Sequence, residues 1–147
     1  MIKINRISKA FNGKPVLDNI SGEFDKGKTN LIIGSSGTGK SVLLKCIVGL
    51  LQPDQGSVYF DLRNFTEADK DMKSEIRREM GMLFQGSALF DSKNVEQNVM
   101  FPLDVLTTKT LEEKLDRVNF CLKRVGLENV NSKMPSEISG GMKKRVG

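Results

Sequence analysis

The feature that most constrains this chain is the stretch IIGSSGTGKSVLL at residues 32–44. Its spacing fits the pattern G-x-x-x-x-G-K-[ST], which predicts a loop whose backbone N–H groups point inward at a phosphate. The pattern also lies where such a loop must lie, between a predicted buried strand at residues 31–33 and a predicted buried helix at residues 41–50. The loop comprises Gly34, Ser35, Ser36, Gly37, Thr38, Gly39, Lys40 and Ser41. The alternative is a Gly/Ser turn before an ordinary helix cap, for which the whole spacing would have to arise by accident.

Two side chains of this loop have predicted roles. Lys40 is expected to reach the β/γ-phosphates as a point charge, and Ser41 is expected to offer its hydroxyl to Mg²⁺, which prefers hard oxygen ligands. The helix that follows would add the positive end of its dipole. The loop therefore predicts a site for a polyphosphate and Mg²⁺.

Several other chemistries are excluded by the residue content. The chain has no histidine, so these residues form neither a His-based metal site nor a Ser-His-Asp triad. Cys46 and Cys121 lie far apart in helical patterns, and we predict that both are reduced core thiols. The net charge is +5, but the basic residues are scattered apart from the short run KKR at residues 143–145. Solvated faces are therefore favoured over a nucleic-acid interface.

Length and hydropathy favour one globular domain. The 147 residues are 38% hydrophobic and 28% charged, so we expect a single core. No apolar run approaches the length of a membrane span, and the N-terminus lacks the apolar stretch of a signal peptide. A cytosolic chain is expected.

Strand and helix signals alternate through the first half. Residues 2–7 and 16–24 are strand-like and flank a turn at Asn12 and Gly13, which predicts an antiparallel pair. Residues 57–60 and 82–84 are predicted to be short strands. Thr66 and Asp69 predict the start of a helix that runs to about residue 79. The apolar residues on one face of that helix are Met72, Ile76 and Met80.

The second half gives the clearest helix signal. Thr110 and Glu113 predict a capping box, and Gly126 stands where a helix C-terminus favours glycine. The apolar residues that recur at helical spacing between them are Leu111, Leu115, Val118, Leu122 and Val125. Ser139 is the predicted N-cap of a last helix that begins near Met142.

Three further elements narrow the interpretation. SEISGGMKKRVG, residues 136–147, resembles the signature sequence of ABC-transporter nucleotide-binding domains, with ISGGM in place of the commoner LSGGQ. MGMLFQGSALFDSKNVEQNVMFPL, residues 80–103, resembles the Q-loop region of that family, with Gln85 at the Q-loop position. Phe11 and Val16 match the aromatic and aliphatic positions of its adenine-stacking loop. Taken one at a time, SGG could be a helix cap, Gln85 a strand-end residue and Phe11 a core aromatic. Together with the P-loop, these elements occur in the same order as in the family, and they extend over the whole chain.

The resemblance implies an α/β fold, a P-loop NTPase of ABC type. Its parts would be an N-terminal antiparallel β subdomain, a parallel core sheet with helices, and a helical subdomain that runs to the signature loop. The C-terminal part of the core would be missing, so residues 1–147 would form an incomplete ABC nucleotide-binding domain.

The resemblance also implies ATP hydrolysis at the interface of a homodimer. Each ATP and its Mg²⁺ would lie between the P-loop of one domain and the signature loop of the other, where Ser139, Gly140 and Gly141 would meet the γ-phosphate. Gln85 would contact Mg²⁺ and the attacking water, and Phe11 would stack on adenine. The implied catalytic residues are Lys40, Gln85 and Ser139, and the implied metal ligands are Ser41 and Gln85.

One departure from the family pattern concerns the catalytic carboxylates. Hydrolysing members have an apolar strand that ends in Asp, then a Glu and later a switch histidine, all after the signature. The similar string VYFDL at residues 58–62 precedes the signature and lacks the Glu, so we interpret it as a strand end. The resemblance therefore implies the N-terminal part of a longer protein, inactive as this piece alone.

The subfamily is indicated by GMLFQGSALFDSKNVEQNVMFPL and SGGM, which look most like the ATPases of lipid-asymmetry importers of the Mla/Mkl type. This similarity implies a transmembrane permease partner, phospholipid or other hydrophobic cargo, and a peripheral position at the cytoplasmic face of the inner membrane. No nucleic-acid partner is expected. Two alternatives remain open, namely a soluble ABC-type ATPase that acts on ribosomes or DNA, and a nucleotide-binding module without turnover.

Overall fold

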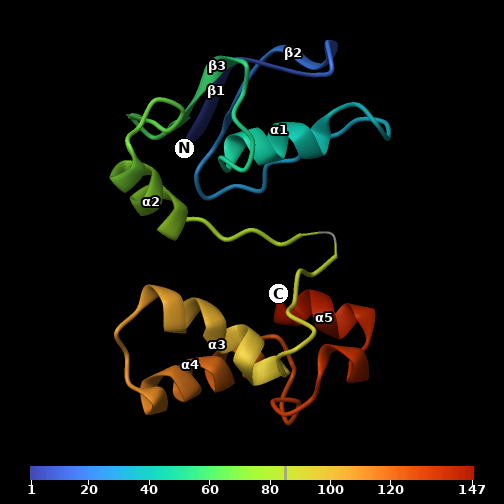
Figure 1. Ribbon diagram of the computed structural model, residues 1–147, viewed down its shortest axis with the longest axis vertical. Helices are drawn as coiled ribbons and strands as arrows, with labels where there is room; N and C mark the ends of the chain where they lie inside the picture. Colours follow the sequence, from blue (N-terminus) through green and yellow to red (C-terminus); the bar gives the residue numbers. More distant parts are fainter. Residues whose placement is uncertain (85) are drawn as a thin grey trace. The chain divides into compact units, whose positions relative to one another are not determined.

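The computed structural model describes residues 1–84 and 86–147, which fall into two units, Met1–Gly81 and Met82–Gly147 (Figure 1). The first unit contains all the described strands together with two helices. The second unit is helical. Each unit has its own hydrophobic cluster, so the prediction of a single core is wrong.

An antiparallel sheet forms the frame of the first unit. Strand β1 (Ile2–Phe11) pairs on one side with β2 (Lys14–Phe24) and on the other with β3 (Gln55–Phe60), and β4 (Arg63–Asn64) completes the order β2-β1-β3-β4. Asn12 and Gly13 join β1 to β2 with φ angles of 50° and 76°, as a tight hairpin turn requires. The predicted antiparallel pair and the predicted strand at residues 57–60 are confirmed.

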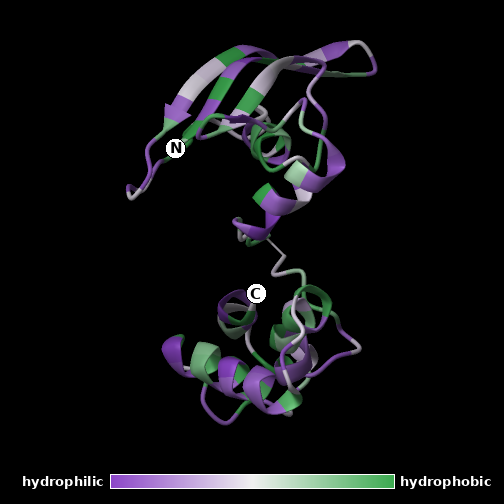
Figure 2. Cartoon of the chain, turned by 90° about the vertical axis from the view of Figure 1, so that its left-hand side faces the viewer, coloured by the Kyte–Doolittle hydropathy of each residue, from purple (hydrophilic) through white to green (hydrophobic). Residues whose placement is uncertain are grey.

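Two helices pack on this sheet. Helix α1 (Lys40–Ile47) buries Leu43, Cys46 and Ile47, and α2 (Lys70–Arg78) buries Ile76. Figure 2 shows hydrophobic residues interspersed with hydrophilic ones along the strands, and β1 buries Ile4 and Ile7 on either side of a register shift. The other buried members of the cluster are Ile4, Ile7, Leu17, Val58, Phe60 and Phe65.

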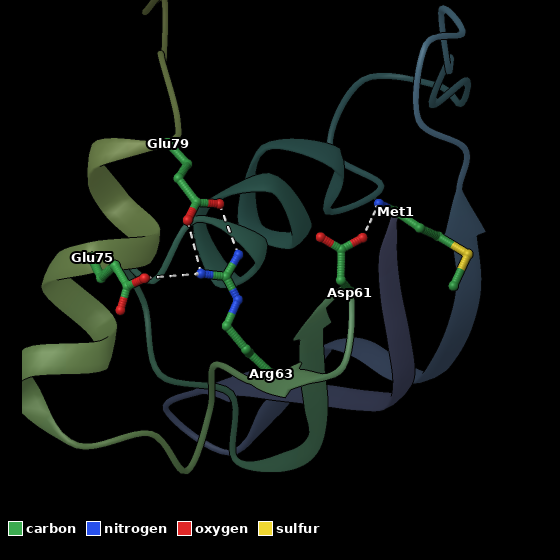
Figure 3. Close-up of polar contacts among 5 residues, drawn as sticks. All are labelled: Met1, Asp61, Arg63, Glu75 and Glu79. Atoms are coloured by element: carbon green, nitrogen blue, oxygen red, sulfur yellow. Dashed lines mark hydrogen bonds and ion pairs between the residues drawn. The ribbon is translucent and has the colours of Figure 1, made fainter.

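Ion pairs hold the end of α2 to the edge of the sheet (Figure 3). Arg63 of β4 donates to both carboxylate oxygens of Glu79, at 2.8 and 2.7 Å, and lies 3.8 Å from Glu75. The N-terminal ammonium of Met1 lies 2.7 Å from Asp61, where the predicted strand end VYFDL turns. Arg63 lowers the pKa of Glu79, and the N-terminal ammonium lowers the pKa of Asp61.

Residues 31–33 and 82–84 were predicted to be strands, and this prediction is wrong for the structure. Neither segment is in a β-ladder with any described residue. Leu31 and Ile33 are 77% and 82% exposed, whereas Ile32 packs against the first cluster. A strand exists through its backbone hydrogen bonds to a neighbouring strand, and no described strand lies beside either segment. No parallel strand pair is present among the described residues.

The second unit packs three α-helices around its cluster. These are α3 (Val95–Leu106), α4 (Leu111–Arg124) and α5 (Gly140–Val146), with the short 3-10 helix η1 (Pro135–Glu137) before α5. Thr110 and Glu113 form the predicted capping box of α4, and Gly126 follows it with φ 65°. The buried residues of the cluster are Val95, Met100, Val118, Leu122, Leu127, Val130 and Ile138.

Three details of the predicted helices need correction. Thr66 does not start α2, because its hydroxyl accepts from Val58 N in the sheet, and Asp69 alone caps the helix. Leu111 is 66% exposed, so it lies outside the buried face of α4. Helix α5 begins at Gly140, two residues before the predicted start. Among the helices of the described residues, none has the length and apolar content to cross a membrane.

Candidate nucleotide site

The P-loop, residues 34–41, leads directly into α1. Gly37 and Gly39 adopt left-handed φ angles of 81° and 88°, and Gly39 is the N-cap of α1. A Cβ atom on Gly39 would lie 2.9 Å from Val16 O and 3.0 Å from Leu17 Cδ2. Glycine is therefore required here for two reasons, the backbone conformation and the close approach of β2. The loop thus lies directly against the start of β2.

Lys40 folds back over the loop that precedes it. Its Nζ donates to Gly34 O at 2.8 Å and to Ser35 O at 2.6 Å, and the Thr38 hydroxyl also donates to Ser35 O, at 2.9 Å. Neutral carbonyls are weaker partners for an ammonium than phosphate oxygens are. These contacts therefore keep the Lys40 ammonium beside the loop, where a bound anion could replace the two carbonyls as its partner.

The backbone of the loop offers a row of donors. Within the part of the chain that the structure describes, no acceptor takes a hydrogen bond from the N–H groups of residues 36–42. These include the first-turn N–H groups of α1, where the helix dipole is positive, and that turn carries no acidic residue among those described. The space beside Gly37 is open, with no described atom within 4 Å of a Cβ placed there. Donors, dipole and open space together fit a phosphate group.

The two predicted adenine-contact residues lie on the β1–β2 hairpin. Val16 is half-buried and approaches Gly39, so it lies beside the P-loop. Phe11 is the last residue of β1 and its side chain is 42% exposed. Lys9 Nζ lies 5.7 Å from the centre of the Phe11 ring. The ring is thus on the surface of the unit that carries the P-loop, which is what a stacking platform needs.

Asp54 fixes the end of β1 and was missed by the sequence analysis. Its carboxylate accepts from Lys9 Nζ at 2.6 Å and from Ala10 N at 2.8 Å. These two donors lower the pKa of Asp54, with the Lys9 hydrogen bond the larger cause. Asp54 therefore holds the residues directly before Phe11. The position of Asp54 directly after Pro53 is only a weak sequence signal for this contact, because Ala10 and Asp54 are 44 positions apart.

The signature residues lie in the second unit. Ser139 is the N-cap of α5, as predicted, and its hydroxyl accepts from Met142 N at 3.3 Å. Gly140 and Gly141 are exposed, and a Cβ on Gly140 would have no described atom within 4 Å. The loop is therefore accessible from solvent. Gln85 lies outside the described residues, so its predicted role stays a prediction.

Two arginines at helix ends were also missed by the sequence analysis. Arg77 donates to Gly49 O at 3.3 Å, where α1 ends, and Arg145 donates to Val125 O at 2.9 Å, where α4 ends. Each contact joins two different helices, so spacing within one helix gives no signal for it.

A cavity of about 290 Å³ lies elsewhere in the first unit, beside Met1, Asp61, Arg63 and Glu79. The N-terminal ammonium pairs with Asp61 and Arg63 pairs with Glu79, so these four groups are engaged with one another (Figure 3). No group of three or more His, Cys, Asp or Glu side chains among the described residues is arranged to hold a metal. The P-loop is therefore the better candidate for a ligand site, because its backbone donors have no acceptor among the described residues.

The sheet, the glycine-rich loop and the helix that follows it define an α/β domain with a candidate phosphate site. The sequence profile of the ABC transporter family matches residues 17–147, and the chain belongs to this family. Its fold is that of an ABC cassette. The chain aligns with the dimeric ATP-binding cassette MJ0796, in a post-hydrolysis state with ADP and Pi, at a TM-score of 0.88 and 31% identity. The alignment covers 99% of this chain and 66% of that one.

Two curated relatives are similar to nearly the whole chain. The protein named "Probable ribonucleotide transport ATP-binding protein mkl" of Mycobacterium tuberculosis is 40% identical over 146 residues. The methionine import ATP-binding protein MetN of Clostridium tetani is 40% identical over 148 residues. Each alignment covers 99% of this chain, but 41% of mkl and 46% of MetN. The chain thus spans less than half the length of these relatives, and the predicted likeness to Mkl-type ATPases is confirmed.

Proposed function

We propose that this chain is the nucleotide-binding part of an ATPase subunit of a bacterial ABC importer, and that it binds Mg²⁺-ATP at the P-loop. The observation that carries the proposal is the loop itself. The N–H groups of residues 36–42 have no acceptor among the described residues, and the loop also carries the positive end of α1 and the Lys40 ammonium. The β- and γ-phosphates are the part of a nucleotide that fits such a site.

The Mg²⁺ ion would be bound mainly by the phosphates of the nucleotide and by only a few protein atoms. Ser41 is exposed at the first turn of α1 and offers a hydroxyl oxygen. Mg²⁺ is commonly bound by one or two protein oxygens with phosphates and waters. We propose that Ser41 supplies one ligand and Gln85 another.

Adenine would lie against Phe11. The ring has no hydrogen-bonding group, so it would bind a purine through its face. Val16, packed on Gly39, would place the hairpin beside the phosphates.

The signature residues would bind the nucleotide of a partner copy. Ser139, Gly140 and Gly141 would meet the γ-phosphate bound by the other copy, so that two ATP molecules become part of a homodimer interface. The MJ0796 cassette, similar over 99% of this chain, is itself described as dimeric. Hydrolysis by the complete protein would rest on positioning and charge stabilisation at this interface.

Residues 1–147 would form a single, incomplete nucleotide-binding domain. The sequence contains no Asp followed directly by Glu. We therefore expect nucleotide binding but no phosphate release above background from residues 1–147 alone. Loss of an activating carboxylate costs orders of magnitude in rate.

The permease partner would dock on residues 85–102. Phe90 and Phe101 are 45% and 38% exposed and pack edge to face, with ring centres 4.8 Å apart. Leu89 beside them is half-buried. An exposed aromatic pair suits a short cytoplasmic helix of a membrane subunit. The chain would then lie peripherally at the cytoplasmic face of the inner membrane.

The cargo proposal rests on similarity alone. The names of the relatives specify ribonucleotide transport for mkl and methionine import for MetN. We propose a hydrophobic cargo such as a phospholipid, from the likeness of residues 80–103 to lipid-asymmetry importers. Comparison of transport of a labelled phospholipid, methionine and a ribonucleotide by the assembled transporter would decide among the three.

The test of the nucleotide site compares two lysines of α1. Lys40→Ala removes the cation from the P-loop, whereas Lys45→Ala removes an exposed cation from the last turn of the same helix. We expect Lys40→Ala to weaken Mg²⁺-ATP binding by about 2 kcal/mol or more, the usual cost of losing one partner of a desolvated charge pair. Lys45→Ala should bind like the wild type. Equal affinity of the two variants in calorimetry would refute the assignment of the P-loop.

A further inference from the structure

The β1–β2 hairpin extends beyond β3 at the end that carries Phe11. Strand β3 begins at Gln55, whose partner on β1 is Ser8. Among the described strands, β2 alone therefore pairs with Ala10 and Phe11. A two-stranded hairpin is only marginally stable by itself. A further contact is needed if the Phe11 ring is to keep one position.

Asp54, the residue directly before β3, supplies that contact. Its N–H donates to Ser8 O at 2.9 Å, and its carboxylate accepts from Ala10 N at 2.8 Å. The side chain thus takes the place that one more residue of β3 would have beside β1. The other carboxylate oxygen accepts from Lys9 Nζ at 2.6 Å. Both oxygens of this one carboxylate therefore bind to β1.

Lys9 connects this carboxylate to the Phe11 ring. The Lys9 side chain is 17% exposed, and a lysine buried to this extent needs a partner for its charge, which Asp54 provides. The Lys9 ammonium lies over one face of the Phe11 ring, where the π electrons attract a cation. Because Lys9 covers that face, the opposite face of the exposed ring is the one left for a base.

We propose that Asp54 is a positioning residue for the adenine base and acts through Lys9 and the Ala10 backbone. It holds the Phe11 ring so that the face away from Lys9 receives the purine. This inference rests on the proposed stacking of adenine on Phe11. It assigns to Asp54 an effect on binding of the base and none on binding of the phosphates, whose proposed contacts are made by residues 34–41.

The chain offers a matched control on the same hairpin. Asp18 of β2 is exposed, and its side chain makes no hydrogen bond or ion pair with any described residue. Asp54→Asn and Asp18→Asn each remove one negative charge from the first unit. Only Asp54→Asn removes the ion pair with Lys9, while its amide oxygen can still accept from Ala10 N. A difference between the two variants therefore reports the ion pair and not the net charge.

The experiment measures binding of Mg²⁺-ATP and of Mg²⁺-tripolyphosphate to the complete natural protein by calorimetry. Tripolyphosphate has the phosphates but no base. Asp54→Asn should weaken ATP binding about threefold and leave tripolyphosphate binding unchanged, as should Lys9→Met, which removes the other partner of the pair. Asp18→Asn should match the wild type for both ligands. Phe11→Ala removes the ring itself, so it should weaken ATP binding about tenfold and leave tripolyphosphate binding unchanged.

Three outcomes would contradict the inference. Equal ATP affinity of Asp54→Asn and Asp18→Asn would show that the ion pair does not position the ring. A parallel loss of ATP and tripolyphosphate affinity in Asp54→Asn and Lys9→Met would show that the pair supports the fold of the unit and not the base site. If Phe11→Ala binds ATP like the wild type, the proposed stacking fails and the inference fails with it, whereas the first two outcomes leave the stacking proposal standing.

Discussion

Replacement of Gly39 by alanine tests the geometry on which the P-loop depends. Gly39 has φ 88°, and an added Cβ would lie 2.9 Å from Val16 O, closer than carbon and oxygen atoms pack without a shift. Gly37 has φ 81° but no described atom within 4 Å of its Cβ position. The two glycines are in the same loop and both have a positive φ, but only Gly39 has close neighbours at its Cβ position. They therefore form a matched pair.

The expected costs follow from these two differences. A left-handed alanine costs about 1–2 kcal/mol, so Gly37→Ala should destabilise the protein by about that amount. Gly39→Ala adds overpacking against the β2 backbone, which typically costs about 1–3 kcal/mol more. Because Val16 O belongs to a strand backbone, it cannot swing away as a flexible side chain would. The extra cost should appear in the free energy of unfolding.

The assay is urea unfolding of the complete natural protein and of each variant, with the midpoint and slope compared. Gly39→Ala should have a clearly lower midpoint than Gly37→Ala at the same slope. Equal midpoints would refute the argument, because they would show that β2 does not lie against the loop as the structure has it.

Three further predictions concern the adenine platform, the Asp54 contact and the permease. Phe11→Ala should weaken ATP and GTP binding to a similar extent in calorimetry, since a ring face does not read base edges; a loss restricted to ATP would contradict the stacking role. Asp54→Asn should destabilise the protein at neutral pH, but the gap in urea midpoint should narrow as pH falls below about 4. The direction of this pH dependence follows from the lowered pKa of Asp54 in the folded state. The Asp54 carboxylate stabilises the fold fully above its unfolded-state pKa, and this stabilisation is lost as the pH falls and the carboxylate is protonated. A difference in urea midpoint that is constant with pH would exclude a role for the charge. Single cysteines at positions 87–94 should crosslink to the membrane subunit of an assembled transporter, and a complete absence of crosslinks would refute docking there.

Local signals in the sequence predicted much of this structure. The Asn12–Gly13 turn, the capping box of Thr110 and Glu113, and the Ser139 cap each depend on residues a few positions apart. The P-loop spacing belongs to the same class, because its glycines and Lys40 act on their own backbone. Such features can be predicted from the sequence because the residues of one short segment satisfy that segment's own backbone hydrogen bonds.

Features that need a distant partner were not predictable in this way. The apolar runs at residues 31–33 and 82–84 have strand composition, but strand formation depends on a neighbour that no single run specifies. Helix α3 was not predicted, although Asn94 and Gln97 form a capping box, and Pro102 inside the helix obscures the pattern. The contacts of Asp54 and Arg145 join separate elements and became evident only from the fold.

The most direct test of the nucleotide site is to follow the backbone N–H groups of residues 36–42 by NMR as Mg²⁺-ATP is added. The account predicts that the largest amide shifts fall on these residues. Their N–H groups have no acceptor among the described residues and would donate to phosphate oxygens once ATP is bound. Shifts of the Lys40 Nζ group should accompany them as it exchanges Gly34 O and Ser35 O for phosphate. Saturable ATP binding with residues 36–42 unshifted would contradict the central claim, since the nucleotide would then lie elsewhere.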